Sequence, residues 1–185
     1  MRKVIGTTGS IGSGKSYAVD IFKKICKEKR INAIFLDVDD IRRNILSKEN
    51  IARNQLNQKI YNDKNAMEEY KQFINPKIKK YLNEQISKND GVIFIEWALL
   101  IEDNIYDIAD SIIMIYCKEE IQIKRLENGD LGKESIMKRI KMQLTNEQKI
   151  DKIKQLKKEF FILDTSDNPK ENEYEELLKK EGLYE

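Results

Sequence analysis

The eight residues from Gly9 to Ser16 constrain the chain most, because they fit the pattern GxxxxGK[ST] in full. An apolar run, Lys3–Gly6, precedes them, and a segment of helical period, Ser16–Lys29, follows. A strand, a glycine-rich turn and a helix in this order form a cradle for phosphate groups. The glycines let successive N–H groups point inward at phosphate oxygens, and the start of the helix adds the positive end of its dipole. The sequence therefore predicts a nucleoside triphosphate site.

The side chains of this motif predict a kinase that uses ATP and Mg²⁺. Lys15 can reach the β- and γ-phosphates, and the Ser16 hydroxyl can bind Mg²⁺. The patterns NKxD and DxxG, which a switch GTPase would need, do not occur in the sequence, and a small-molecule kinase fits the chain better. The residues expected to hold ATP here are Ser10, Ile11, Gly12, Ser13, Gly14, Lys15 and Ser16.

Composition excludes several other classes of protein. The chain of 185 residues contains no histidine, which removes Ser-His-Asp triads and histidine-ligated zinc. Its 34 basic and 32 acidic residues nearly cancel, so no nucleic-acid partner is expected. Its apolar runs are strand-sized, so no membrane partner is expected either. With only Cys26 and Cys117 as cysteines, we expect a reduced cytoplasmic protein, either a monomer or a weak oligomer.

Short apolar runs alternate with longer segments of helical period along the whole chain, which predicts a three-layer α/β fold with a five-stranded parallel sheet. The expected strands are Lys3–Gly6, Ala33–Leu36, Val92–Ile95, Ile112–Tyr116 and Phe160–Leu163. The expected helices are Ser16–Lys29, Asp39–Ser47, Ile51–Ile60, Ala66–Ile74, Lys77–Ser87, Glu119–Leu126, Lys133–Leu144, Glu147–Lys158 and a segment from Glu171 onward.

Carboxylates follow two of the expected strands, at the sheet edge where ligands bind in such folds. Asp37, Asp39 and Asp40 come after the second strand. We expect at least one of them to accept a proton from an attacking hydroxyl or to hold Mg²⁺, and one to cap the next helix. Glu96 ends the third strand and is a candidate Mg²⁺ ligand, whereas Glu102 is a candidate for structural pairing.

Two arginines and the single tryptophan each have two interpretations. Arg125 could contact ATP phosphates when a lid closes, or it could pair with an acidic side chain on the helix surface. Arg139 lies in a basic helical segment that could be only a solvated face, but we expect it to bring a catalytic cation to the phosphates on closure. Trp97 follows the third strand and could stack on a base in the acceptor pocket or pack in the core.

Taken together, these motifs resemble the dephospho-coenzyme A kinase family of P-loop kinases. Gly9–Ser16 followed by Asp37-x-Asp39-x-Ile41-x-Arg43 is similar to that family's GxIGSGKS and DxDxIxR. Weaker similarities follow in the family's order: Arg53-x-x-Leu56-x-x-x-Ile60-Tyr61, Ile74-Asn75-Pro76-x-Ile78, Glu96-Trp97-Ala98-Leu99-Leu100-Ile101-Glu102, Gln122-x-x-Arg125-Leu126 and Arg139-Ile140-x-x-Gln143.

The resemblance implies transfer of the ATP γ-phosphoryl group to the ribose 3′-hydroxyl of dephospho-coenzyme A. It implies that Asp39 is the base and shares in holding Mg²⁺ with Ser16 and Glu96. It further implies that the acceptor lies near Asp39, Arg43, Trp97 and Leu99. The single domain would comprise a core (residues 1–47, 91–124 and 147–185), a helical acceptor-binding subdomain (48–90) and a lid (125–146).

The chain also departs from the family pattern. Asn75 replaces a histidine, Ala98 replaces a proline, and Gly129 stands where the lid usually carries an arginine. Asp164–Asp167 replaces an Asn-x-Gly segment near the adenine. Two alternatives therefore stay open. One is a related nucleoside or nucleotide kinase with a different acceptor, and the other is a catalytically weak ATP-binding module that works through a partner protein.

Overall fold

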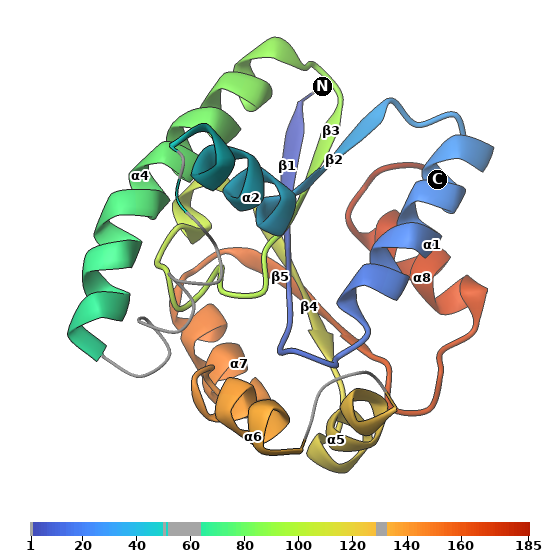
Figure 1. The fold of residues 1–185 in the computed structure, drawn as a ribbon. Coiled ribbons are helices and arrows are strands. Elements are labelled where there is room, and N and C mark those ends of the chain that lie inside the picture. Colours follow the sequence, from blue (N-terminus) through green and yellow to red (C-terminus); the bar gives the residue numbers. More distant parts are fainter. Residues whose placement is uncertain (1, 50, 52–63, 129–132) are drawn as a thin grey trace.

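A single parallel sheet of five strands forms the centre of the molecule, in the order β2-β3-β1-β4-β5 (Figure 1). The computed structural model describes residues 2–49, 51, 64–128 and 133–185. The strands are β1 (Lys3–Thr8), β2 (Ala33–Asp37), β3 (Val92–Glu96), β4 (Ser111–Tyr116) and β5 (Glu159–Asp164). Each contains the strand predicted from the sequence, so the predicted fold class is confirmed.

Helices cover both faces of this sheet, which gives three layers (Figure 1). The helices of the described residues are α1 (Lys15–Glu28), α2 (Val38–Lys48), α4 (Lys64–Lys88), α5 (Glu119–Glu127), α6 (Lys133–Lys141), α7 (Asn146–Gln155), α8 (Glu171–Lys180) and the short 3-10 helix η1 (Tyr106–Ile108). Apolar side chains of α1 and α8 pack on one face of the sheet, and those of α2, α4 and α7 pack on the other.

The central strands are apolar at nearly every position because both of their faces are covered. In β1, Val4 packs toward α2 and α4, whereas the next residue, Ile5, packs toward α1 and α8. In β3, Phe94 stacks on Phe22 of α1 with ring centroids 5.7 Å apart. This double burial holds the β1 end rigidly, and the phosphate loop begins there.

Helix α4 runs without a break through Pro76, and here the sequence prediction is wrong. We expected two helices, Ala66–Ile74 and Lys77–Ser87, because proline removes a backbone donor and usually ends a helix. However, Ile74, Ile78 and Leu82 recur every four residues on both sides of the proline, and each is at most 1% exposed. Burial of this continuous stripe outweighs the local cost of the proline. No helix among the described residues, α4 included, is long and apolar enough to cross a membrane.

Both cysteines lie in the interior, as expected for small apolar residues. Cys26 and Cys117 are free and buried. Burial raises the pKa of the Cys26 thiol to about 11 and also raises the pKa of Cys117. Both thiols are therefore protonated and unreactive near neutral pH.

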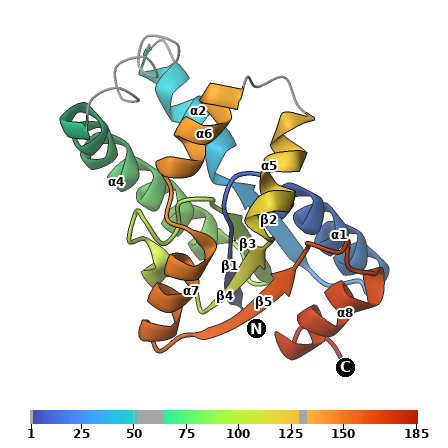
Figure 2. The same cartoon turned by 90° about the horizontal axis from the view of Figure 1, so that it is seen from below.

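The parallel arrangement brings all carboxyl ends of the strands to one edge of the sheet. Glu96, at the end of β3, lies in register with Asp37 of β2 on one side and Thr7 of β1 on the other. Figure 2 shows this end of the molecule, with α2, α5 and α6 around it. The strand order therefore brings the predicted carboxylates next to the phosphate loop.

Candidate active site

The phosphate loop has the open backbone that its glycines predict. Gly12 and Gly14 have φ angles of 76° and 85°, in the left-handed region that favours glycine. A Cβ atom on Gly12 would also lie 2.9 Å from Cγ of Leu126 in α5. Gly14 is the N-cap residue of α1 and forms no side-chain cap. The first N–H groups of α1 therefore lack a side-chain acceptor, as an anion site at a helix N-terminus requires.

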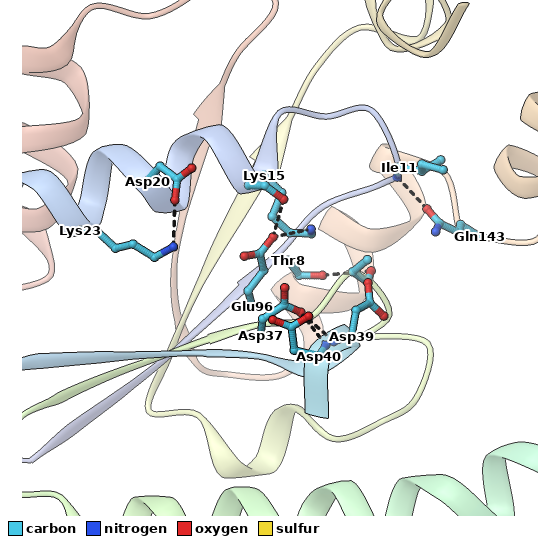
Figure 3. A network of polar contacts seen from close by, with 12 residues as sticks. Thr8, Ile11, Lys15, Asp20, Lys23, Asp37, Asp39, Asp40, Glu96 and Gln143 are labelled. Carbon is cyan, nitrogen blue, oxygen red and sulfur yellow. Dashed lines mark hydrogen bonds and ion pairs between the residues drawn. The ribbon is translucent and has the colours of Figure 1, made fainter. Parts of the chain in front are cut away.

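Lys15 and Ser16 converge on one carboxylate oxygen. The Lys15 Nζ atom lies 2.9 Å from Oε1 of Glu96, and the Ser16 hydroxyl donates a hydrogen bond of 2.8 Å to the same atom. Only 15% of the Lys15 side chain and 13% of the Glu96 side chain are exposed, so the ion pair is largely shielded from water. Figure 3 shows Glu96 beneath Lys15, with Asp37, Asp39 and Asp40 beside it.

The three aspartates have three different positions. Asp37 caps α2, because its Oδ1 atom accepts hydrogen bonds from the N–H groups of Asp39 (2.7 Å) and Asp40 (3.3 Å). The Asp39 side chain is 62% exposed and forms an ion pair of 3.1 Å with Arg42. Asp40 pairs with Arg43 on the helix surface. The expectation that one aspartate caps the helix is thus confirmed for Asp37, and the Asp39 carboxylate stays largely exposed beside Arg42.

We expect Asp37→Ala to lower the free energy of unfolding by about 1 kcal/mol, because two N–H groups of α2 lose their acceptor. Urea unfolding of the free protein measures this change. The matched control is Asp40→Ala, which removes an exposed carboxylate from the same turn and should change stability by less than about 0.5 kcal/mol. Equal losses in the two variants would show that the cap does not stabilise α2.

Arg125 faces the phosphate loop through Thr165. Its guanidinium donates to the Thr165 hydroxyl (2.9 Å) and to the Thr165 carbonyl (2.5 Å), and the same hydroxyl donates to the Ser13 carbonyl (2.6 Å). Within the described part of the chain, Arg125 bonds to Thr165 and Asn168 and to no acidic side chain, and its contact with ATP stays a prediction. Thr165 lies in the segment that departs from the family pattern, and it carries contacts that sequence reasoning missed.

Two glutamines hold the peptide groups of Ile11 at the tip of the loop. The Ile11 N–H donates to Oε1 of Gln143 (2.9 Å), and the Ile11 carbonyl accepts from Nε2 of Gln122 (2.6 Å). Sequence reasoning assigned neither glutamine a role, although Gln143 stands four residues after Arg139. Arg139, in α6, is half-buried and forms no hydrogen bond or ion pair within the described part of the chain.

Of the predicted acceptor residues, Trp97 lies in the core. Its side chain is 2% exposed and packs in the apolar cluster beneath α2 and α4, so its ring cannot stack on a base. The core-packing interpretation of Trp97 is therefore correct, and the base-stacking interpretation is wrong. Leu99 is half-buried against the same cluster, and Arg43 is exposed and paired with Asp40. The other residue pattern assigned to this region, from Arg53 to Tyr61, lies outside the described residues.

A buried carboxylate, Asp103, faces two cations on the same side of the site. Burial raises the pKa of Asp103, and the Lys71 ammonium, 3.3 Å away, partly offsets this rise. The Arg42 guanidinium also lowers the pKa of Asp103. Arg42 therefore lies close enough to lower the pKa of Asp103 while it pairs with Asp39.

Comparison with known proteins identifies the family. Residues 39–158 match the family model described as dephospho-CoA kinase. A dephospho-CoA kinase of Fusobacterium nucleatum is 31% identical over 166 residues, which cover 80% of this chain and 85% of the relative. One of Listeria innocua is 28% identical over 187 residues, covering 91% and 90%. The chain belongs to the dephospho-CoA kinase family.

Solved structures with low sequence identity to this chain have the same fold. A Thermus thermophilus protein superposes with a TM-score of 0.81 at 18% identity, covering 100% of this chain and 99% of that one. A deoxyadenosine kinase of M. mycoides with bound dATP gives a TM-score of 0.57 at 15% identity, covering 97% and 99%. The P-loop lies before the stretch matched by the dephospho-CoA kinase family model, but the curated relatives cover most of the chain.

Proposed function

We propose that this protein transfers the γ-phosphoryl group of ATP to the ribose 3′-hydroxyl of dephospho-CoA, the reaction for which its family is named. The observation that carries the proposal is the convergence of Lys15 and Ser16 on Glu96, beside the exposed carboxylate of Asp39. A phosphate cradle supplies the donor site, and a carboxylate at the same sheet edge supplies the acceptor site. The proposal thus assigns both halves of a phosphoryl transfer to this edge of the sheet.

The chemistry requires positioning and charge stabilisation more than covalent steps. The loop N–H groups and the Lys15 ammonium bind the phosphates and stabilise the charge that develops on the transferring group. Asp39 accepts the proton of the 3′-hydroxyl as that oxygen forms its bond to the γ-phosphorus and the bond to ADP breaks. Arg42, 3.1 Å from the Asp39 carboxylate, orients this base.

Mg²⁺ fits the oxygen atoms that meet at the end of the loop. Magnesium prefers hard oxygen ligands and is usually held by one or two protein groups together with substrate phosphates. The Ser16 hydroxyl and the Glu96 carboxylate already lie 2.8 Å apart, so they are the groups we assign to the ion, with Asp39 as a further candidate. When bound, Mg²⁺ neutralises charge on the β- and γ-phosphates.

Cations on the remaining elements serve the anionic substrates. Arg139 has no partner of its own among the described residues, which supports the proposal that it is the lid cation that arrives on closure. Arg125 is proposed to bind ATP from its place beside the loop. On the acceptor side, Arg42 and Lys71 are better placed than the surface pair Arg43–Asp40 to attract an acceptor phosphate.

We keep the predicted division of the chain and its setting as part of this proposal. Residues 48–90 form the acceptor-binding subdomain and residues 125–146 the lid, with α4 and α6 inside these ranges. The enzyme acts in the cytoplasm on small molecules, as a monomer or weak oligomer, without a nucleic-acid or membrane partner.

Product mass tests the acceptor directly. With Mg²⁺-ATP, we expect dephospho-CoA to gain the mass of one phosphate and ADP to appear in equal amount. A parallel reaction contains a mixture of nucleoside monophosphates instead. Phosphorylation only in that reaction would contradict the acceptor and indicate a related nucleotide kinase. ATP binding without transfer in either reaction would contradict the enzymatic function itself.

A further inference from the structure

A second lysine lies buried behind the phosphate loop, and the kinase mechanism proposed above does not use it. The side chain of Lys149, in α7, is 0% exposed, and its Nζ atom lies 2.9 Å from Oε1 of Glu102. The same ammonium donates a hydrogen bond of 2.7 Å to the Ala98 carbonyl, which also accepts from the Thr8 hydroxyl at the end of β1. Lys149 and the end of β1 are therefore joined through one shared acceptor, the Ala98 carbonyl.

Glu102 extends this contact to the end of the lid. Its Oε1 atom accepts a hydrogen bond of 3.1 Å from the Leu144 N–H, three residues after the end of α6. The Leu144 carbonyl in turn accepts from the Ser10 hydroxyl at 3.5 Å, and the preceding residue, Gln143, holds the Ile11 N–H. Oε1 of Glu102 thus contacts both Lys149 and the end of the lid, where Gln143 and Leu144 bond to the phosphate loop.

The burial of this pair is expensive if its only task is stability. Two charges lose their hydration, and Oε2 of Glu102 is buried without a hydrogen-bond partner among the described residues. Burial lowers the pKa of Lys149, Glu102 opposes this change, and the nearby Lys15 ammonium adds to it. Apolar residues of similar volume often stabilise a core as well as such a pair does. A role in positioning neighbouring groups explains the buried charges of Glu102 and Lys149 better.

We propose that Glu102 is a positioning residue for phosphoryl transfer, because its carboxylate fixes the end of the lid at Leu144 against the phosphate loop, with Lys149 as its buried counter-ion. Without this anchor, Gln143 no longer holds Ile11 in place, and the cations of α6 lose their fixed starting point relative to the γ-phosphate. Small misplacements of this kind lower kcat strongly without removing substrate contacts. The inference rests on the proposed kinase function, but its structural part can be measured without turnover.

The decisive comparison uses two double variants that both remove the buried ion pair. Glu102→Met/Lys149→Met removes both charges and the acceptor for the Leu144 N–H. Glu102→Gln/Lys149→Met also removes both charges but retains a side-chain oxygen that can accept this hydrogen bond. We expect the first variant to lose at least about tenfold in kcat while KM for ATP changes by less than about threefold, and the second to keep most of its kcat.

Lys3 and Glu181 provide a matched control at the opposite end of β1. They form a buried ion pair of 2.7 Å, with side chains 16% and 0% exposed, far along the strand from the loop. Lys3→Met/Glu181→Met should cost similar stability and leave kcat unchanged. If this control loses as much kcat as Glu102→Met/Lys149→Met, or if the two Glu102 variants have equal kcat, the proposal fails.

Hydrogen exchange separates failure of this inference from failure of the proposed function. In the free wild-type protein, the amides of Leu144 and Ile11 should be protected by Glu102 and Gln143, and both should exchange at least about tenfold faster in Glu102→Met/Lys149→Met only. Unchanged protection would overturn the anchor even in an active enzyme. If the double variant loses protection but the wild-type protein phosphorylates no acceptor, the proposed function fails and the anchor stands.

Discussion

Replacing Lys15 with methionine is expected to lower kcat by on the order of 10²–10³-fold, because the site loses a preorganised cation where charge develops on the transferred phosphoryl group. Methionine keeps most of the length of the side chain, so the fold should be retained. Binding of ATP should also weaken, since Glu96 is left without its cation partner close to the phosphates. Steady-state kinetics and calorimetric titration with ATP measure the two effects.

A second variant separates charge repulsion from catalysis. In Lys15→Met/Glu96→Gln, the unpaired negative charge is gone, so ATP binding should recover in part while kcat stays low. The control is Lys27→Met, which removes an exposed lysine from the last turn of α1 and should leave both quantities unchanged. A Lys15→Met protein with kcat within about tenfold of wild type would contradict the assigned role of Lys15.

The elements of the fold follow from local patterns in the sequence, and the exceptions have physical reasons. Double burial of a parallel strand requires continuous apolar runs such as Val92–Ile95, and these are visible in the sequence. Pro76 is misleading because its local preference is overridden by a buried stripe that extends on both sides of it. Trp97 illustrates the same limit, since a residue next to a strand end can point into the core as readily as into the site.

The site residues also divide into those that the sequence reveals and those that it does not. The phosphate loop is a contiguous motif, so Lys15 and Ser16 could be assigned from spacing alone, and Glu96 followed from its place at the end of a strand. Thr165 and Lys149 could not, because their partners are distant in the sequence and depend on how α5 and α7 pack. A signal for Lys149 did exist: it shares a helical face with Asn146 and Ile153, both buried, although it lies in a strongly charged segment.

The largest test of the acceptor site is Asp39→Asn, which should reduce phosphoryl transfer by about 10²–10⁴-fold while the Kd for ATP changes little. Asparagine keeps the shape of the side chain but cannot accept the proton of the attacking hydroxyl. Asp39 is exposed and its carboxylate does not cap α2, so we expect the variant to fold normally. Kinetics with dephospho-CoA and titration with ATP should therefore give divergent results for this one variant.

The neighbouring aspartate makes this test specific. Asp40→Asn removes another exposed carboxylate one residue away, whose partner is Arg43 instead of Arg42. If Asp39 is the base, Asp40→Asn should retain kcat within about threefold, and the two variants should unfold at the same urea concentration. A normal rate in Asp39→Asn together with a large loss in Asp40→Asn would instead assign the base to Asp40. The acceptor would then approach over the cleft that Asp40 lines with Asn44 and Tyr81.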